Sequence, residues 1–294
     1  MTKVLCVATE KGGEGKTTVA IFVASYISQI KNKKVLIIDL DPQGDISSHY
    51  LAMEGDPFAP DQQKFKSPPK HPEYTENDTE WDGISSSAAI FTGSENIYPY
   101  PTKFANLDIL PAFSTPLQQV EEVRSNEIKE LVIDALYDFI NLEYIQNTYD
   151  LIVYDTRPSK GALTSAALHC STDLLMPCQM EYFSENGIYG MLGYAEEEQE
   201  MRPYDRPLNL IGILPNQVDD RTSLHQKTLK TLTDSAAEIV MSETYLRKRI
   251  KYAELMPYDA KKTEPFELPD SDPAKEEASK MCEYVYEKIF GENK

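Results

Sequence analysis

Cysteine and histidine are scarce in this sequence, which has only four of each among its 294 residues. No two cysteines are spaced as Cys-x-x-Cys and the histidines are scattered, so the sequence lacks the ligand spacing of a zinc site. We therefore expect reduced cysteines that pack in the interior, at positions 6, 170, 178 and 282.

Long apolar runs are absent as well. No stretch of 18 consecutive apolar residues occurs, whereas a helix that spans a bilayer needs about 20. The N-terminus begins on a strand-like run and lacks the basic and apolar regions of a secretory signal. We expect a cytoplasmic protein without a stable membrane anchor.

Basic residues are outnumbered, since 29 lysines and arginines face 48 aspartates and glutamates and leave a net charge of −19. A charge of this sign repels nucleic acid and anionic membranes at long range. Any contact with DNA must therefore come from a local basic patch.

Short apolar runs recur along the chain and have the length of buried parallel strands. They begin at Val4, Val35, Leu107, Leu151, Leu174 and Leu210. Stretches with helical periodicity lie between or after them, at 17–30, 117–145, 184–200, 223–237 and 274–290. This alternation predicts an α/β fold with a doubly wound, mostly parallel sheet flanked by helices, and a ligand at the carboxyl ends of the strands. We expect one domain over residues 1–294.

Two segments differ from this pattern. Residues 53–82 contain five prolines and eight acidic residues, which predicts a long, polar surface insertion that can be mobile. The acidic run at 196–200 is expected to form a solvated helix face.

The sequence EKGGEGKTT, residues 10–18, is close to the phosphate-binding pattern Gly-x-x-x-x-Gly-Lys-Ser/Thr, but Glu10 stands where the first glycine belongs. Glycines let backbone N–H groups approach a polyphosphate, here at Gly12, Gly13 and Gly15. Lys16 is placed to neutralise phosphate oxygens, and Thr17 to ligate Mg²⁺ at the start of a helix. An apolar strand precedes the loop, so the sequence predicts a P-loop NTPase that binds ATP and Mg²⁺.

Carboxylates follow two of the predicted strands. Asp39 and Asp41 lie in DLDPQG after the run from Val35, and Asp155 ends the run from Leu151. Strand ends of a parallel sheet meet at one edge, so these side chains are expected near the phosphates. Asp155 is the natural magnesium-associated residue of a Walker B strand.

These motifs resemble the ParA/MinD family of deviant Walker ATPases, and in particular its DNA partition ATPases. KGGEGKTT matches the family's KGGxGKT[ST], DLDPQG matches its second motif, and YDTRPS corresponds to D-x-P-P-S. Arg157 replaces the first proline of that last motif, and its role is left open. The likeness covers nearly the whole chain except the insertion.

The resemblance implies a role for the extra lysine, Lys11. It would reach across an ATP-sandwich homodimer to the phosphates bound by the partner subunit, so that Lys11, Lys16 and Asp41 form the catalytic group. Asp41 would position or activate the attacking water.

The resemblance also implies the remaining site residues. Asp39 would support the magnesium of Thr17 and Asp155 through water. Thr18 would bind the α-phosphate and Asn216 would face the adenine edge, completing a set of nucleotide contacts at Gly12, Gly13, Glu14, Gly15, Lys16, Thr17, Thr18 and Asn216.

Between positions 221 and 251 seven basic residues face three acidic ones, a local excess of four. In the family that this chain resembles, such segments bind DNA without sequence preference. The implied contacts are Arg221, Arg247, Lys248, Arg249 and Lys251. Dimerisation with ATP would double this patch, a ParB-like centromere-binding protein would stimulate slow hydrolysis, and the protein would associate with nucleoid DNA.

Other functions on the same scaffold remain open. One is a MinD-like or protein-cargo positioning ATPase, although the C-terminal stretch from Lys280 mixes glutamate and lysine on its polar face and is expected to dock on the domain. Another is a metabolic enzyme, either a dethiobiotin-synthetase-like ligase or an iron-protein reductase. The ligase gives Lys11 no role, and the reductase needs cysteines between Cys6 and Cys170, where none occur.

Overall fold

The computed structural model describes residues 1–61, 64–180, 185–202, 206–256 and 265–291. A seven-stranded sheet lies at its centre, in the order β5-β6-β2-β7-β1-β8-β9. The strands are β1 (Lys3–Val7), β2 (Val35–Leu40), β5 (Tyr100–Pro101), β6 (Leu107–Leu110), β7 (Leu151–Thr156), β8 (Asp173–Gln179) and β9 (Asn209–Asn216). All six predicted runs are strands of this sheet.

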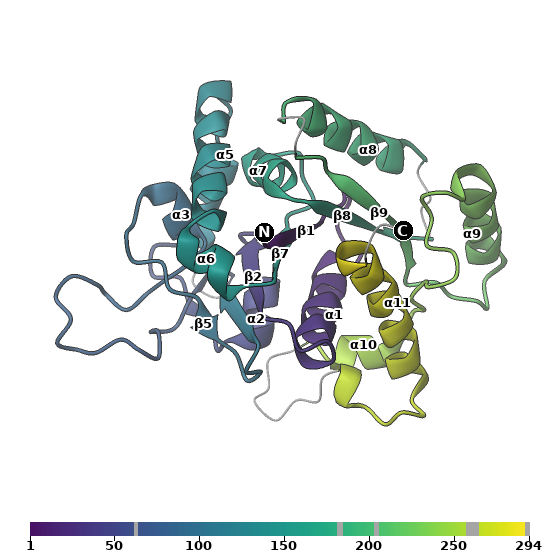
Figure 1. The fold of residues 1–294 in the computed structure, drawn as a ribbon, viewed down its shortest axis with the longest axis horizontal. Helices are drawn as coiled ribbons and strands as arrows, with labels where there is room; N and C mark the ends of the chain where they lie inside the picture. Colours follow the sequence, from purple (N-terminus) through teal and green to yellow (C-terminus); the bar gives the residue numbers. More distant parts are fainter. Residues whose placement is uncertain (62–63, 181–184, 203–205, 257–264, 292–294) are drawn as a thin grey trace.

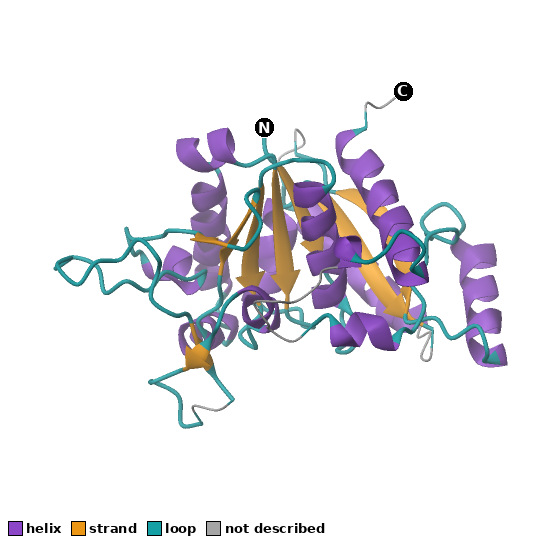
Figure 2. Cartoon of the chain, turned by 90° about the horizontal axis from the view of Figure 1, so that it is seen from below, coloured by secondary structure: helices purple, strands orange, loops and turns teal. Residues whose placement is uncertain are grey.

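All neighbouring pairs are parallel except β5 with β6. Almost every residue of β1, β2 and β7 is buried, which explains why these strands read as continuous apolar runs rather than alternating ones. Figure 2 shows the arrowheads of the parallel strands at one edge of the sheet, the edge that receives the loops carrying the sequence motifs.

Helices cover both faces of the sheet (Figure 1). On one face, α1 (Lys16–Gln29), α2 (Asp45–Tyr50), α10 (Ile250–Glu254) and α11 (Pro273–Phe290) contribute to one apolar core. The other face carries α5 (Asn126–Ile140), α7 (Ala162–Cys170) and α8 (Glu185–Glu200), and α9 (Ser223–Ala236) lies beyond the edge strand β9. The prediction of a doubly wound α/β fold is confirmed, and all four cysteines are unpaired and buried.

The predicted helix over 117–145 is wrong as a single element, because the chain forms α4 (Ser114–Glu121), α5 and α6 (Glu143–Thr148). Ser125 and Leu142 precede α5 and α6 with ψ near 132° and 137°, which is incompatible with a continuous helix. Helical periodicity continued across both breaks because apolar residues of the segment pack on one core.

The acidic run at 196–200 is not wholly solvated. Glu198 is only 2% exposed, and Ser165 Oγ donates a 2.5 Å hydrogen bond to its Oε1. Glu198 therefore anchors α8 against α7, and the expectation of a solvated face fails at this residue.

The insertion at 53–82 includes a short antiparallel ribbon of β3 (Glu54–Gly55) and β4 (Lys66–Ser67). Beyond it, the ring of His71 lies 4.6 Å from that of Tyr100 and 5.5 Å from that of Trp81, measured between centroids. Tyr100 belongs to β5, so this aromatic cluster fastens the insertion to the edge of the sheet before the short helix α3 (Ala88–Thr92).

None of the helices in the described ranges is both long and apolar enough to cross a membrane.

Candidate nucleotide site

The phosphate loop connects β1 to α1 at the carboxyl edge of the sheet. Gly13 and Gly15 have φ angles of +82° and +84°, in the left-handed region that favours glycine. A Cβ on Gly15 would also lie 2.3 Å from Nδ2 of Asn216. Both the backbone conformation and the side chain of Asn216 therefore require glycine at position 15.

Lys16 lies beneath this loop with only 6% of its surface exposed. Its Nζ donates to Thr9 Oγ1 at 3.3 Å and to the carbonyl oxygen of Lys11 at 3.5 Å, both long contacts. Burial lowers the pKa of Lys16, while the charges of Asp155 and Asp41 raise it. A phosphate oxygen would be a better acceptor than either of the two present.

The carboxylates of β2 and β7 are adjacent, because Asp39 pairs with Asp155 in the parallel register. Thr17 Oγ1 donates a 2.8 Å hydrogen bond to Asp155 Oδ2. The other oxygen, Oδ1, is buried and has no hydrogen-bond partner among the described residues. Burial, then the charges of Asp39 and Asp41, raise the pKa of Asp155 well above its ordinary value.

A buried carboxylate oxygen without a partner, next to a threonine hydroxyl, fits a hard divalent cation such as Mg²⁺. Asp155 and Thr17 would hold such an ion, and its charge would stabilise phosphate oxygens at the loop.

Asp39 is fully buried behind this pair. Its Oδ1 accepts from the backbone N–H of Asp41 at 3.1 Å, and its Oδ2 accepts from Ser47 N at 3.1 Å and Ser47 Oγ at 2.5 Å. Burial raises the pKa of Asp39 to about 7. With both oxygens already accepting, Asp39 is suited to support a hydrated ion rather than to ligate it directly.

Asp41 and Arg157 follow the paired residues Leu40 and Thr156, so they leave the sheet side by side. Asp41 is partly exposed, and its Oδ1 accepts from Gln43 N at 2.9 Å. Burial raises the pKa of Asp41, whereas the charges of Lys16 and Arg157 lower it. The sequence alone leaves the role of Arg157 open, although the matching positions of the two motifs at the ends of parallel strands indicate that Arg157 lies near Asp41.

Glu14 and Gly13 fasten the loop to the ends of the neighbouring strands β8 and β9. The buried carboxylate of Glu14 accepts from the backbone N–H of Gln179, and burial raises its pKa while the charges of Lys11 and Lys16 lower it. The Gly13 carbonyl accepts from Gln179 Nε2 at 2.5 Å and from Gln217 Nε2 at 2.8 Å.

Neither glutamine, Gln179 or Gln217, is among the residues predicted from the sequence. They follow predicted strands, but the order of strands in the sheet was needed to place them beside the loop.

Asn216, predicted to face adenine, donates from Nδ2 to the carbonyl oxygen of Glu14 at 2.7 Å. In this structure it supports the loop backbone. Thr18, predicted to bind the α-phosphate, lies in the first turn of α1 with its Oγ1 3.5 Å from Met256 Sδ. Lys11 is partly buried at the loop mouth, close enough to Glu14 for its charge to lower the pKa of that carboxyl.

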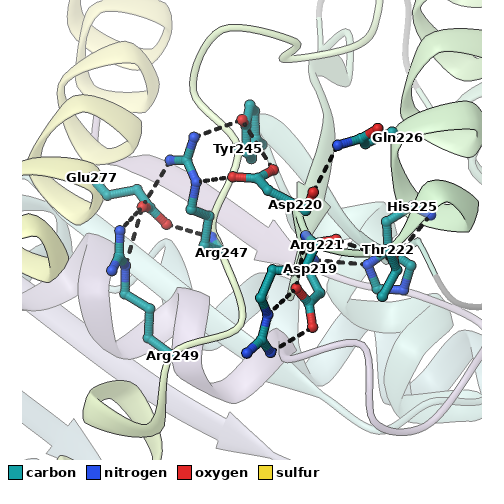
Figure 3. A network of polar contacts seen from close by, with 10 residues as sticks. All are labelled: Asp219, Asp220, Arg221, Thr222, His225, Gln226, Tyr245, Arg247, Arg249 and Glu277. Carbon is teal, nitrogen blue, oxygen red and sulfur yellow. Dashed lines mark hydrogen bonds and ion pairs between the residues drawn. The ribbon is translucent and has the colours of Figure 1, made fainter.

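The predicted DNA-binding residues lie in the segments that follow β9, and Figure 3 shows Arg221, Arg247 and Arg249 among them with their carboxylate neighbours. Arg221, Arg247 and Arg249 all face carboxylates in this structure, from Asp219, Asp220 and Glu277. Lys251 pairs with Glu254 at 3.4 Å, and the backbone N–H of Lys248 donates to the carbonyl oxygen of Val218. The local excess of four positive charges is thus reduced by acids outside the counted segment.

Comparisons with known proteins agree with this architecture. The chromosome-partitioning ATPase Soj of Treponema pallidum is 28% identical to this chain over 254 residues, 86% of each sequence. A plasmid partition protein from Borrelia burgdorferi has the same fold, with a TM-score of 0.66 at 21% identity over 98% of this chain and 99% of that one.

A third similar structure is cobyrinic acid a,c-diamide synthase from Mycobacterium smegmatis with bound ADP and magnesium. Its TM-score is 0.59 at 25% identity, covering 80% of this chain and 82% of the synthase. The model of the family described as AAA domain matches residues 2–205, well over half of the chain. The matched segment contains the phosphate loop and both carboxylate-bearing strands, so the chain belongs to this AAA domain family and is a P-loop ATPase of the ParA/MinD group.

Proposed function

We propose that this chain is an ATP-dependent DNA partition ATPase. It binds ATP with Mg²⁺ at the phosphate loop, forms an ATP-sandwich homodimer and holds DNA without sequence preference. It hydrolyses ATP slowly, under stimulation by a ParB-like centromere-binding protein, and acts on nucleoid DNA.

The observation that carries the nucleotide part is the Thr17–Asp155 hydrogen bond, next to the buried amine of Lys16. The second carboxylate oxygen, Asp155 Oδ1, has no hydrogen-bond partner within the described residues. A site for a cation and a site for phosphate thus adjoin at the carboxyl edge of the sheet. Similarity to a synthase that holds ADP and magnesium supports the same ligands here.

The choice of partition as the process is supported by the printed roles of the relatives, a chromosome-partitioning ATPase and a plasmid partition protein. The two basic segments that follow β9 in sequence supply arginines for phosphate contacts. Arg221 is the most accessible of them, with 88% of its side chain exposed.

Two measurements test this proposal. Binding of the purified chain to two unrelated DNA duplexes is followed by fluorescence anisotropy with ATP and Mg²⁺, with ADP and without nucleotide. ATP turnover is measured in parallel, with Lys16→Ala as the inactive control. We expect DNA binding that depends on ATP and is equal for both duplexes.

Failure would take two distinguishable forms. ATP turnover without any DNA binding would favour positioning of a protein cargo or a membrane-cycling function, and binding of ATP-loaded protein to anionic vesicles would separate these two. A second substrate that is required for turnover would favour a metabolic ligase.

A further inference from the structure

The arginines that DNA binding requires are neutralised within the chain. Arg221 makes two bonds of 2.8 Å to the carboxylate of Asp219. Arg247 Nε donates to Asp220 Oδ2 at 2.5 Å, and its Nη1 donates to Glu277 Oε2 at 3.1 Å. Figure 3 shows the two guanidinium groups of Arg247 and Arg249 on either side of Glu277.

Glu277 is the central residue of this network. It projects from α11 with 8% of its side chain exposed, and its Oε2 also accepts from Arg249 Nη2 at 2.7 Å. The backbone N–H of Arg247 donates to the other oxygen. A carboxylate this buried is held by charged partners, so leaving it unpaired is costly.

Pairing of this kind opposes DNA binding. Three guanidinium groups, Arg221, Arg247 and Arg249, face three carboxylates, Asp219, Asp220 and Glu277, so the local net charge is zero (+3 and −3). The phosphate backbone is attracted by uncompensated positive charge, and its affinity grows with each cation that replaces a counterion. Before Arg247 or Arg249 can act in this way, its carboxylate partner must be exchanged for phosphate.

The structure has room for that exchange. A cavity of about 290 Å³ is lined by Tyr245, Arg247, Arg249, Glu276, Glu277 and Lys280, among others. A phosphate group could enter beside the two guanidinium groups without opening the apolar core.

The same network is linked to the phosphate loop through a short stretch of backbone. Asn216 and Gln217 bond the loop carbonyls of Glu14 and Gly13. The next residue, Val218, donates its N–H to the Leu246 carbonyl at 3.0 Å and accepts from Lys248 N at 2.9 Å. Asp219 and Asp220 follow directly.

We propose that Asp220 and Glu277 form an acidic clamp that keeps Arg247 and Arg249 from DNA in the nucleotide-free chain, and that nucleotide at the phosphate loop releases it through Asn216–Asp220. This inference rests on the proposed function. A ligand shifts the equilibrium between clamped and released arginines only if it binds one of these states better. ATP would favour the released state if the phosphate loop, when it binds ATP, loses the hydrogen bonds that Asn216 and Gln217 make to its carbonyl oxygens.

The test uses Glu277→Gln with Glu276→Gln as its matched control. Both variants remove one negative charge from the same helix and the same cavity wall, but Glu276 is 64% exposed and pairs with Lys280 rather than with an arginine. Glu277→Gln keeps a side-chain oxygen that can accept the hydrogen bond from the backbone N–H of Arg247. Affinity for a duplex is measured by anisotropy over a salt series, without nucleotide and with a non-hydrolysable ATP analogue.

We expect Glu277→Gln to raise nucleotide-free affinity about tenfold and to reduce the gain from the ATP analogue by the same factor. The slope of log K against log salt should steepen by about 0.9 for each arginine released. Glu276→Gln should stay within about twofold of the parent protein, as exposed pairs contribute little.

Asp220→Asn, at an exposed position, should also raise the nucleotide-free affinity for DNA, by a smaller factor. The test therefore does not depend on how well Glu277→Gln folds. If both variants match Glu276→Gln while the parent protein binds DNA with ATP, the clamp is wrong and the proposed function stands. If the parent protein binds no DNA under any condition, the proposed function fails and the clamp fails with it.

Discussion

Thr17 donates its hydroxyl hydrogen to Oδ2 of Asp155 at 2.8 Å, which joins the first turn of α1 to the end of β7. The two residues are 138 positions apart in sequence. The bond orients the carboxylate so that its second oxygen is left buried without a partner in the described parts of the chain. We therefore expect the two motifs to form one cation site.

Asp155→Asn should weaken this site. An amide keeps the size and the acceptor for Thr17 but removes the negative charge that a divalent cation requires. We expect the Mg²⁺ concentration for half-maximal ATP turnover to rise by about tenfold or more. A magnesium titration at saturating ATP measures it, and an unchanged midpoint would exclude Asp155 as a ligand.

Lys11 and Lys16 should have different functions. Lys16 is buried under the loop, where we expect it to contact nucleotide of its own subunit, so Lys16→Ala should weaken nucleotide binding itself. Lys11 lies at the loop mouth, and Lys11→Ala should retain nucleotide binding but stay monomeric with ATP. Equilibrium binding of ATP measures the first effect and light scattering with and without ATP measures the second. A Lys11→Ala protein that dimerises normally would contradict the cross-subunit role.

Asp41→Ala should stop hydrolysis while ATP binding persists. Its carboxylate lies at the carboxyl edge with a raised pKa, as suits a group that orients water or takes up a proton. Loss of such a group typically costs roughly 10²-fold or more in rate. Single-turnover hydrolysis and equilibrium binding of ATP separate the two effects, and turnover at the parent rate would remove Asp41 from the mechanism.

Arg221→Ala tests the DNA surface with little structural side effect, because within the described ranges that side chain bonds to Asp219, two positions earlier in the same loop. It should weaken ATP-dependent binding to unrelated duplexes equally and flatten the salt slope by about 0.9. The double change of Arg247 and Arg249 to alanine should also destabilise the fold, by about 1–3 kcal/mol, since Glu277 would remain buried without its partners. Salt titrations and thermal melts measure these two quantities, and an unaltered slope in Arg221→Ala would place the DNA surface elsewhere.

Asp39 makes the stability of the metal-free protein depend on pH. Its pKa is about 7 in the folded chain and 3.8 as an ordinary group, so between these values the folded state binds more protons than the unfolded state. The unfolding free energy should therefore fall as pH rises through this window. Urea unfolding at pH 5 and pH 7 with a chelator measures the difference. It should shrink in Asp39→Asn and persist in the control Asp45→Asn, an exposed carboxylate of α2.

The candidate nucleotide site at the carboxyl edge of the sheet was predictable from sequence because its residues follow buried strands at fixed distances. Parallel strands bring their carboxyl ends together, so Asp39, Asp155 and the phosphate loop had to meet once the runs from Val4, Val35 and Leu151 were identified. Their paired register in the sheet agrees with that reasoning.

The acidic partners of the arginines were not predictable in the same way. Asp219 and Asp220 immediately precede the segment 221–251, and Glu277 lies far from it in sequence, on α11, so none of the three carboxylates contributes to the charge of that segment. No periodicity specifies that α11 packs beside the segment containing Arg247. A run of charges in sequence therefore overstated the charge presented at the surface.

The breaks within 117–145 escaped prediction for a different reason. Extended backbone at Ser125 and Leu142 separates α4, α5 and α6, while the apolar spacing that signals a helix continues through both points. The spacing of apolar residues indicates which side of a segment faces the core. It does not show where one helix ends and the next begins in a new direction.

The parallel pairing of β2 with β7 restricts how this protein can be lengthened or shortened. Because Asp39 is opposite Asp155 and both side chains lie at the strand ends, deleting a single residue inside either strand would turn every following side chain to the opposite face. One carboxylate would then point away from the phosphates even though all the motif residues were still present in the sequence. We expect insertions to be tolerated instead in the connections between motifs, such as residues 53–82.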